Sequence, residues 1–349
     1  MTKNRFTAPQ GRYAVIRAHV ATVLLTVVLY ILSACSASGD IRFDRFGVQD
    51  GLSDNTLTSI IRDSRGFMWF GTMNGLNRFD GYNYVSYKYN PTDSTSLSDN
   101  LVISLFEDSR GVLWIGTNNG GLNRFDHETG KFKRYVNTPD DPESISSNCV
   151  YSITEGIDGI IWMGTLYGLN ALDPERGVFK RFFHDPADTA SLNNSNTGSV
   201  HADKNGDLWV GTNEGLNVIE HKTGKIIRLP DTNEKTSMLN QNIIDIIEGD
   251  DGSLWLSTWG GGLRKFNKHT REYTVFISDP KNPNTLNSDI VGHMAIDGNG
   301  VLWFGTTAGL HSIDTGSGVI QAFLHDPSNP FSMSANLIWG VYVDRAGIL

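Results

Sequence analysis

A tryptophan that returns at a nearly constant interval is the feature that most restricts what this chain can fold into. Six tryptophans, at positions 69, 114, 162, 209, 255 and 303, are separated by 45 to 48 residues. A short polar segment repeats in phase with them, at residues 52–55, 97–100, 145–148, 192–195, 239–242, 286–289 and 333–336. A fixed period of this length is typical of repeat proteins, in which each unit buries its apolar surface against its neighbours.

Within one period the sequence predicts four short strands. In the second repeat they cover residues 102–107, 113–117, 121–126 and 132–136, with Gly and Asp turns between them. An Asp-x-x-Gly turn recurs, with aspartate at positions 63, 108, 203 and 297. The carboxylate can accept hydrogen bonds from the turn amides, and the glycine takes the left-handed backbone of a tight hairpin. Each repeat is therefore predicted to be a four-stranded antiparallel meander.

The second strand of each repeat is apolar on both faces, as in Leu113-Trp114-Ile115. Such a strand has to lie between two other sheets, and radial packing of sheets provides that environment. Four strands in about 47 residues match one blade of a β-propeller. We therefore predict an all-β fold, a β-propeller of four-stranded antiparallel blades with six complete blades and a partial seventh.

The two ends of the repeat region are predicted to meet in the last blade. Residues 41–46 align with residues 130–135, the fourth strand of the second repeat, and lack three preceding strands of their own. This N-terminal strand is expected to belong to the last blade, where it removes an exposed edge. The seventh repeat reaches Leu349, where its tryptophan is due. We therefore expect an open or poorly closed ring, and a chain that forms the front part of a longer protein.

Residues 1–35 are predicted to be an export signal. Four basic residues precede an apolar run at residues 20–32 that is too short to span a bilayer: Lys3, Arg5, Arg12 and Arg17. The Leu-Ser-Ala-Cys sequence at residues 32–35 resembles a bacterial lipoprotein signal box, which implies lipidation of Cys35. Cleavage after Ala37 and an uncleaved signal anchor are the alternatives. Residues 36–40 are predicted to be a short linker and residues 41–349 the propeller, exported to the periplasm or cell surface.

Composition excludes several classes of protein. A formal charge of −9 argues against nucleic-acid binding, which requires a basic surface. Two cysteines exclude a disulfide-rich scaffold and a cysteine-based zinc cluster, and Cys149 is expected to be a small core residue. The nine histidines are scattered without the spacing of metal ligands, so neither a metal site nor a cofactor is expected.

The repeats resemble a known family. The pattern Asp-x-x-Gly-x-Leu-Trp-Ile/Phe-Gly-Thr followed by Gly-Leu-Asn-x-Phe-Asp, as at residues 63–72 and 75–81, is similar to the two-component regulator propeller repeat. The resemblance implies an extracytoplasmic ligand-sensing propeller of a two-component signal transduction protein, of the hybrid sensor histidine kinase type, that responds to a carbohydrate. It also implies C-terminal signalling domains beyond residue 349, attachment to the membrane through the lipid anchor or a later helix, and a homodimer.

Two other functions stay open at this stage. The lipoprotein box favours a free-standing surface lipoprotein that binds a glycan or a protein, and a propeller enzyme acting on glycans is a further alternative. No catalytic residue is predicted within this chain. His127-Glu128 lies in a hairpin turn, and the glycine clusters at residues 119–121 and 260–262 precede no helix that could bind phosphate.

A ligand site is predicted at one end of the propeller. In a meander, the loop before the first strand and the turn between the second and third strands lie at the same end, and long loops on a rigid scaffold carry recognition. Trp259 is the main candidate, because the equivalent residues are Met, Asn, Leu, Asn and Thr. Capping of a neighbouring loop is the alternative role for this side chain. The remaining predicted ligand residues lie in the equivalent turns: Tyr167, Asn74, Asn118, Asn119, Asn213 and Glu214.

Overall fold

The computed structural model describes residues 41–229, 242–344 and 347–349. The chain divides into two compact units, Met1–Asp44 and Arg45–Leu349. In the first unit, the four described residues, 41–44, form neither helix nor strand. The predicted export signal, Cys35 and the linker lie outside the described residues. No helix within the described ranges is long and apolar enough to cross a membrane.

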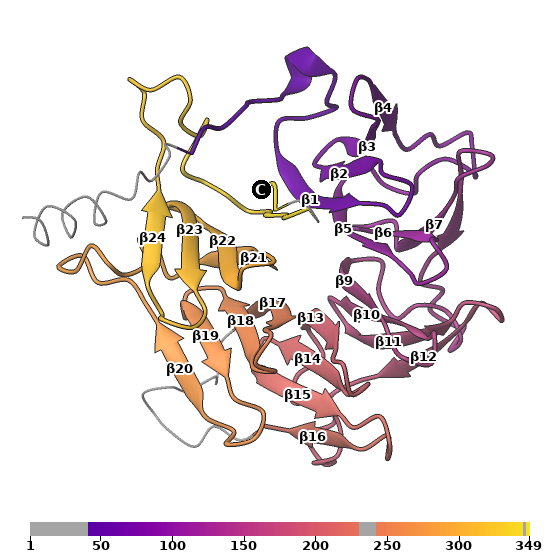
Figure 1. Ribbon diagram of the computed structural model, residues 1–349. Helices are drawn as coiled ribbons and strands as arrows, with labels where there is room; N and C mark the ends of the chain where they lie inside the picture. Colours follow the sequence, from indigo (N-terminus) through magenta and orange to yellow (C-terminus); the bar gives the residue numbers. More distant parts are fainter. Residues whose placement is uncertain (1–40, 230–241, 345–346) are drawn as a thin grey trace, which may run out of the picture. The chain divides into compact units, whose positions relative to one another are not determined.

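The second unit contains 24 strands in six four-stranded antiparallel sheets, within the part of the chain that is described (Figure 1). In chain order the sheets are β1 (Leu57–Arg62), β2 (Met68–Thr72), β3 (Gly75–Phe79), β4 (Tyr84–Tyr87); β5 (Val102–Glu107), β6 (Leu113–Thr117), β7 (Leu122–Asp126), β8 (Lys131–Tyr135); β9 (Val150–Glu155), β10 (Ile161–Thr165), β11 (Gly168–Asp173), β12 (Val178–Phe182); β13 (Thr197–Ala202), β14 (Leu208–Thr212), β15 (Gly215–Ile219), β16 (Ile226–Arg228); β17 (Ile243–Glu248), β18 (Leu254–Thr258), β19 (Leu263–Phe266), β20 (Tyr273–Phe276); and β21 (Val291–Ile296), β22 (Val301–Thr306), β23 (Gly309–Asp314), β24 (Ile320–Phe323). We number these sheets as blades one to six.

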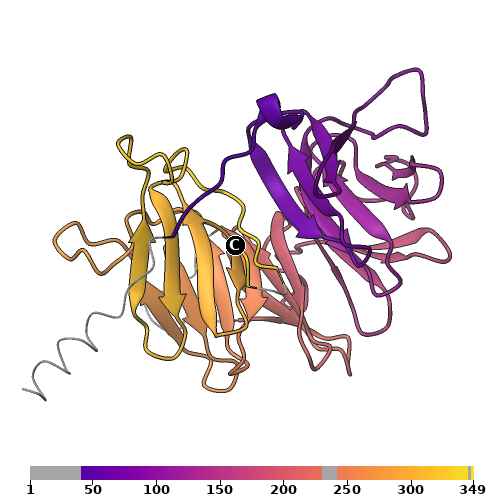
Figure 2. The ribbon, with the colours of Figure 1, turned by 45° about the horizontal axis from the view of Figure 1, so that its top comes forward.

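The six blades pack face to face around a common axis (Figure 2). In each blade the first strand lies nearest the axis, and the first strands of successive blades contact one another, from β1 to β21. Within every blade the strands pair in chain order. The prediction of an all-β propeller with six complete four-stranded blades is therefore confirmed.

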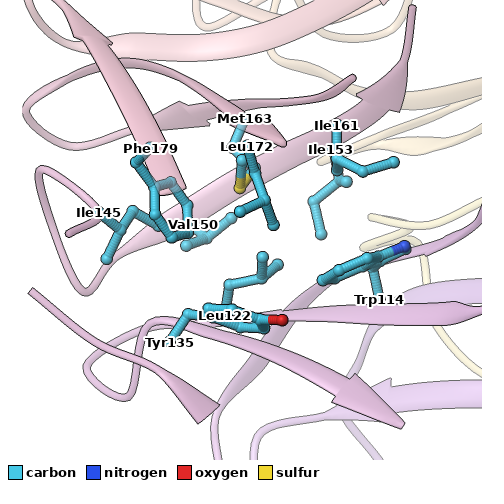
Figure 3. Packing of buried hydrophobic residues seen from close by; sticks show 10 residues of the cluster. All are labelled: Trp114, Leu122, Tyr135, Ile145, Val150, Ile153, Ile161, Met163, Leu172 and Phe179. Atoms are coloured by element: carbon cyan, nitrogen blue, oxygen red, sulfur yellow. The ribbon is translucent and has the colours of Figure 1, made fainter. Parts of the chain in front are cut away.

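The hydrophobic core consists of the seams between blades. Figure 3 shows the seam between blades two and three, where Trp114 and Tyr135 face Ile153, Met163 and Phe179. All five residues of β6, β14 and β18 are buried, as expected for strands that are covered on both faces.

The aspartate of the turn forms a hydrogen bond with the tryptophan of the same repeat. Asp108 Oδ1 accepts hydrogen bonds from the backbone N–H groups of Arg110 (3.0 Å) and Val112 (2.9 Å), as the turn motif predicts. Its second oxygen, Oδ2, accepts a hydrogen bond from Trp114 Nε1 (3.0 Å). The same bond to the tryptophan occurs at Asp63 (2.7 Å), Asp203 (3.0 Å) and Asp297 (3.3 Å). The turn aspartate therefore also fixes the indole at the blade seam.

The seventh repeat contributes an inner segment without an assigned strand. Among the described residues, neither 41–46 nor those after Phe323 belong to a strand, so the partial seventh blade and its N-terminal strand stay predictions. Backbone hydrogen bonds nevertheless connect this segment to blade six, from Ile338 N to Thr306 O (3.0 Å) and from His293 N to Trp339 O (2.9 Å).

The same segment also reaches blade one. Asp344 Oδ2 lies 3.4 Å from Arg62 Nη1, at the end of β1. The inner segment therefore contacts both of its neighbouring blades. Because it forms no assigned strand among the described residues, the expectation of an open or poorly closed ring stays a prediction.

Candidate functional site

A β-bulge near the start of the first strand recurs in every blade. In blade two, Val102 pairs with Thr117 and Ser104 pairs with Gly116, so Ile103 has no partner in β6. The same register shift occurs in blades one, three, four and five, and in blade six two residues, Gly292 and His293, lack a partner in β22. A bulge removes one residue from the ladder and re-aims its side chain. In this propeller the unpaired residues of five blades line one cavity on the axis: Ile103, Tyr151, Gly198, Ile244 and His293.

This cavity, which we call the axial pocket, has a volume of about 220 Å³. It is completed by Asn196, Asn242, Ile243, Trp259 and Trp339. The pocket lies at the end of the axis where the first strands begin. The turns between second and third strands are at the same end, because Trp259 N donates a hydrogen bond to Asn242 O (3.0 Å), just before β17. The predicted grouping of these two loop sets is therefore confirmed.

Two tryptophans form one wall of the axial pocket. Trp259 is 54% exposed, and its ring meets that of Trp339 edge to face, with centroids 5.7 Å apart and planes at 62°. Trp259 therefore both contacts a neighbouring segment and presents aromatic surface to the pocket. A half-exposed indole with a polar edge is suited to a ligand that has apolar faces and hydrogen-bonding edges.

Tyr151 supplies a hydroxyl that stays protonated. Burial, with Cys149 beside it, raises the pKa of Tyr151 to about 12. The phenol therefore remains a neutral hydrogen-bond donor across the physiological pH range. Cys149 itself is buried, as predicted, and its Sγ donates to Asn118 Oδ1 over 3.6 Å.

His293 lies beside Trp339 in the lining of the pocket. Its Nδ1 lies 3.7 Å from Asp245 Oδ2, and its ring stands edge to face against Trp339, with centroids 6.2 Å apart. Asp245 Oδ2 also accepts a hydrogen bond from Met294 N (2.9 Å). None of the ten described residues that line the pocket is an aspartate, glutamate, lysine or arginine. The pocket therefore offers aromatic surface and largely uncharged hydrogen-bonding groups.

Of the predicted ligand residues, Trp259 lines the axial pocket and the others lie elsewhere at the same end. Tyr167 is 60% exposed and packs against Phe183, with ring centroids 5.2 Å apart. Four of the other predicted residues form hydrogen bonds with the loop before the first strand. Asn74 Nδ2 donates to Ser53 O, Asn119 N to Asp99 Oδ2 and Asn213 N to Asn196 O, and Glu214 Oε1 accepts from Asn194 Nδ2. The structure therefore brings none of these six into the pocket, and a ligand role for them stays a prediction.

The bulge residues were missed by sequence reasoning. Their signal is a position that varies from repeat to repeat, directly after a constant aliphatic or small residue: Ile103, Tyr151, Gly198 and Ile244. A strand pattern alone assigns every second residue to a blade seam. A bulge shifts this alternation, so the pattern places these side chains on the wrong face.

A family model agrees with the repeat boundaries. The model of the two-component regulator propeller matches residues 51–74, 96–119, 144–167, 191–214 and 285–308. Each match runs from the loop before a first strand to the turn after the second strand, and so includes the start of the first strand, the turn that follows it and the tryptophan. Blade five lies outside the matches, and it is the blade in which Ser257 replaces the glycine after the tryptophan.

The chain is also similar to individual sensor proteins. It is 38% identical over 76 residues to histidine kinase P4 of Formosa agariphila, which covers 21% of this chain and 6% of that protein. The extracellular domain of the hybrid two-component system BT3049 from B. thetaiotaomicron superposes with a TM-score of 0.73 at 25% identity, over 88% of this chain and 40% of that one. This chain thus spans less than half the length of either.

A solved enzyme shares the fold. Streptogramin B lyase superposes with a TM-score of 0.62 at 18% identity, over 85% of this chain and 90% of the lyase. At this level of identity the likeness concerns the propeller scaffold, and function has to be argued from the site.

Proposed function

Because the chain belongs to the two-component regulator propeller family, we propose that it is the extracytoplasmic ligand-sensing propeller of a two-component signalling protein. The similarity to the extracellular domain of a hybrid two-component system supports both the sensing role and export. Binding rather than catalysis is the role of this region. The observation that carries the proposal is the axial pocket, since it is the place where variable residues from five blades converge.

A carbohydrate is the ligand class that the axial pocket favours. Sugar rings have apolar faces and a rim of hydroxyls, and the pocket provides the indoles of Trp259 and Trp339 with the neutral donors Tyr151 and Asn196. Ligand pockets commonly combine apolar walls with a few placed polar groups in this way. Trp259 is the residue that we assign to stacking.

The output is proposed from the relatives alone. The name of histidine kinase P4 supports C-terminal signalling domains, through which ligand binding to this propeller would control a kinase. Attachment to the membrane and a homodimer are further expectations. A free-standing surface lipoprotein is the second candidate, because the sequence at residues 32–35 resembles a lipidation box. Reading the gene beyond residue 349 separates the two: a membrane helix and a kinase support the sensor, and a stop codon supports the lipoprotein.

One repeated contact supports the proposed seventh blade. In three blades an arginine of the fourth strand donates to carbonyl oxygens of the loop before the first strand of the same blade: Arg134, Arg181 and Arg228. Arg45, which aligns with Arg134, donates to Ser332 O (2.8 Å) and Met333 O (3.3 Å) in the corresponding loop of the seventh repeat. This contact favours residues 41–46 as the fourth strand of that blade.

Tryptophan fluorescence tests the proposed ligand. The chain is titrated with neutral oligosaccharides cut from glucans, xylans and mannans, and we expect one class to give a saturable change. Trp259→Ala should weaken that binding about tenfold, because an aromatic contact of this kind contributes on the order of 1 kcal/mol or more. Tyr82→Ala is the control, since Tyr82 is 90% exposed at the opposite end. Equal affinity of the Trp259 variant and the wild type, or no response to any sugar, contradicts the carbohydrate proposal.

A further inference from the structure

A second cavity lies at the opposite end of the propeller, among the turns of blades one and two. This cavity, which we call the basic groove, has a volume of about 630 Å³. Five of its lining residues are cationic: Arg65, Arg110, Arg124, Lys131 and Lys133. Two lining residues are acidic, Asp126 and Glu128, so the groove carries a net positive charge in a chain whose formal charge is −9.

Two of the cations stand directly opposite each other on neighbouring strands. Arg124 in β7 is paired with Lys133 in β8. Like charges in this position are destabilising by up to about 1 kcal/mol. The equivalent pairs of the other five blades hold at most one cation: Arg78 with Val85, Ala171 with Lys180, Val218 with Ile227, Lys265 with Thr274, and Ser312 with Gln321. Blade two therefore keeps a repulsive pair that strand pairing does not require.

The acids in and beside the groove compensate its positive charge only in part. Arg110 is paired with the buried Asp108, at 3.0 Å. Within the described ranges, Arg65, Arg124, Lys131 and Lys133 form no salt bridge shorter than 4.0 Å. Asp126 stands opposite Lys131 in the strand ladder, and in the turn its Oδ1 accepts hydrogen bonds from Glu128 N (2.8 Å) and Thr129 N (3.3 Å).

A half-buried imidazole, that of His127, also lines the groove. His127 packs edge to face against Trp69 and Phe125, with ring centroids 6.2 and 5.1 Å away. Its Nε2 is buried and has no hydrogen-bond partner among the described residues. Burial, followed by the positive charge of Arg65, lowers the pKa of His127. An anion beside this ring would oppose both effects and raise that pKa.

We propose that the basic groove binds a sulfate or phosphate group carried by a soluble ligand. Guanidinium groups match the geometry of tetrahedral oxyanions, and hydrogen bonds between ionised partners are about twice as strong as neutral ones. Arg124 and Lys133 share the bound anion, which removes their mutual repulsion. The groove is hollowed between turns, so it suits a discrete group better than a flat lipid surface. This site is separate from the axial pocket, which has no lysine or arginine in its lining.

Calorimetric titration of the chain with inorganic sulfate and with inorganic phosphate, against chloride at equal ionic strength, tests the proposal. We expect saturable binding of at least one dianion, weakened about a hundredfold in Arg124→Ala/Lys133→Thr, since two charge-assisted contacts of roughly 1.5 kcal/mol each are removed. Both replacements are residues that other blades carry at these positions, Ala171 and Thr274. Lys180→Thr in blade three is the matched control and should bind as the wild type does.

Two further readouts keep the test decisive. In wild type, the bound dianion should raise the pKa of His127, followed by NMR, and the double variant should lose this response. If the double variant fails to fold, Lys131→Thr replaces it, since Lys131 lines the same groove and its removal should also weaken binding of the dianion. Absence of saturable binding to either dianion overturns the proposal. So does binding to phosphatidylcholine vesicles containing phosphatidylglycerol without binding to the free dianions, which would assign the groove to a membrane surface.

Discussion

The two ends of this propeller are built on different rules. At the axial end, five of the ten described residues that line the pocket have no partner in the strand ladder, and they differ from blade to blade. At the other end, turn aspartates such as Asp108 bond to the turn amides and to the tryptophan of the seam, and four blades keep that arrangement. The difference favours the proposed role in recognition for the axial end and a role in stability for the turn end. The basic groove is the exception at the turn end.

The largest expected effect tests the turn end. Asp108→Ala removes the acceptor of Trp114 Nε1 and of two turn amides from a side chain that is 4% exposed. We expect the free energy of unfolding in urea to fall by about 3 kcal/mol, because buried donors are left unsatisfied. Asp158→Ala is the control, since Asp158 is exposed and accepts one turn amide bond from Ile160 N (3.2 Å). Equal losses in the two variants would show that the indole bond is unimportant.

The next effect concerns ligand binding at the axial end. Tyr151→Phe removes the hydroxyl of a bulge residue and leaves the strand ladder intact. Affinity for the oligosaccharide that the wild type binds should fall about fivefold, the value of one neutral hydrogen bond of roughly 1 kcal/mol. The thermal midpoint should not change.

Tyr135→Phe makes the same chemical change at a blade seam. Its hydroxyl is buried without a hydrogen-bond partner among the described residues, and Tyr135 lies outside the pocket. Sugar affinity should equal that of the wild type. A loss of affinity in this variant comparable to that of Tyr151→Phe would remove the distinction between pocket and seam.

A third effect is expected in the pH dependence of stability. Four blades have a buried asparagine at the same position of the third strand, where its Oδ1 accepts a backbone N–H from the loop before the first strand: Asn77, Asn123, Asn170 and Asn217. In blade six His311 takes this place, and its Nε2 accepts from Asn287 N (3.2 Å). Burial lowers the pKa of His311.

The sign of this dependence follows from proton binding. The unfolded histidine titrates near 6.5, above the folded pKa, so the unfolded state binds more protons between the two values. Stability should therefore fall as the pH decreases below about 6.5. His311→Asn restores the residue of the other blades, and its thermal midpoint should fall less between about pH 7.5 and pH 5. An unchanged slope would mean that other groups, such as the buried His201, control the acid sensitivity.

The smallest expected effect tests the like-charged pair of the basic groove. Arg124→Ala removes one member of the like-charged pair and should raise the free energy of unfolding by about 0.5 kcal/mol in low salt. High salt should remove the difference, because exposed charges are screened. Arg78→Ala in blade one should instead lower stability, since Arg78 faces Val85 and stacks on the ring of Phe67 at 4.7 Å. A loss of stability in both variants would argue against repulsion in the groove.

Most of the fold could be predicted because its determinants are local and repeated. A single repeat already shows the strand lengths and a second strand that is apolar on both faces. The six tryptophans then fix the period of the repeat. The seam bond between Asp108 and Trp114 could not be predicted, since turn chemistry already accounts for the aspartate.

The candidate site was predicted less well, for a geometric reason. Trp259 was found because it departs from its equivalents in a turn, and the structure places it in the axial pocket. Tyr151 and His293 were not found, because a bulge is defined by the pairing of two strands and leaves no mark on one strand alone. The basic groove was missed for a related reason: Arg124 and Lys133 are nine residues apart in the chain and meet only through the hairpin register.

The recurring bulge separates two kinds of selection within one repeat. Because Ile103, Tyr151 and Ile244 have no partner in the second strand of their blades, we expect a mutation there to change the pocket lining more than the strand pairing. Related propellers can thus differ in the residues that line this pocket, and in the ligand that we propose it binds, while their scaffold stays the same. A comparison of such genes should therefore show rapid change at these few codons against a background of slow change at the tryptophan and its aspartate.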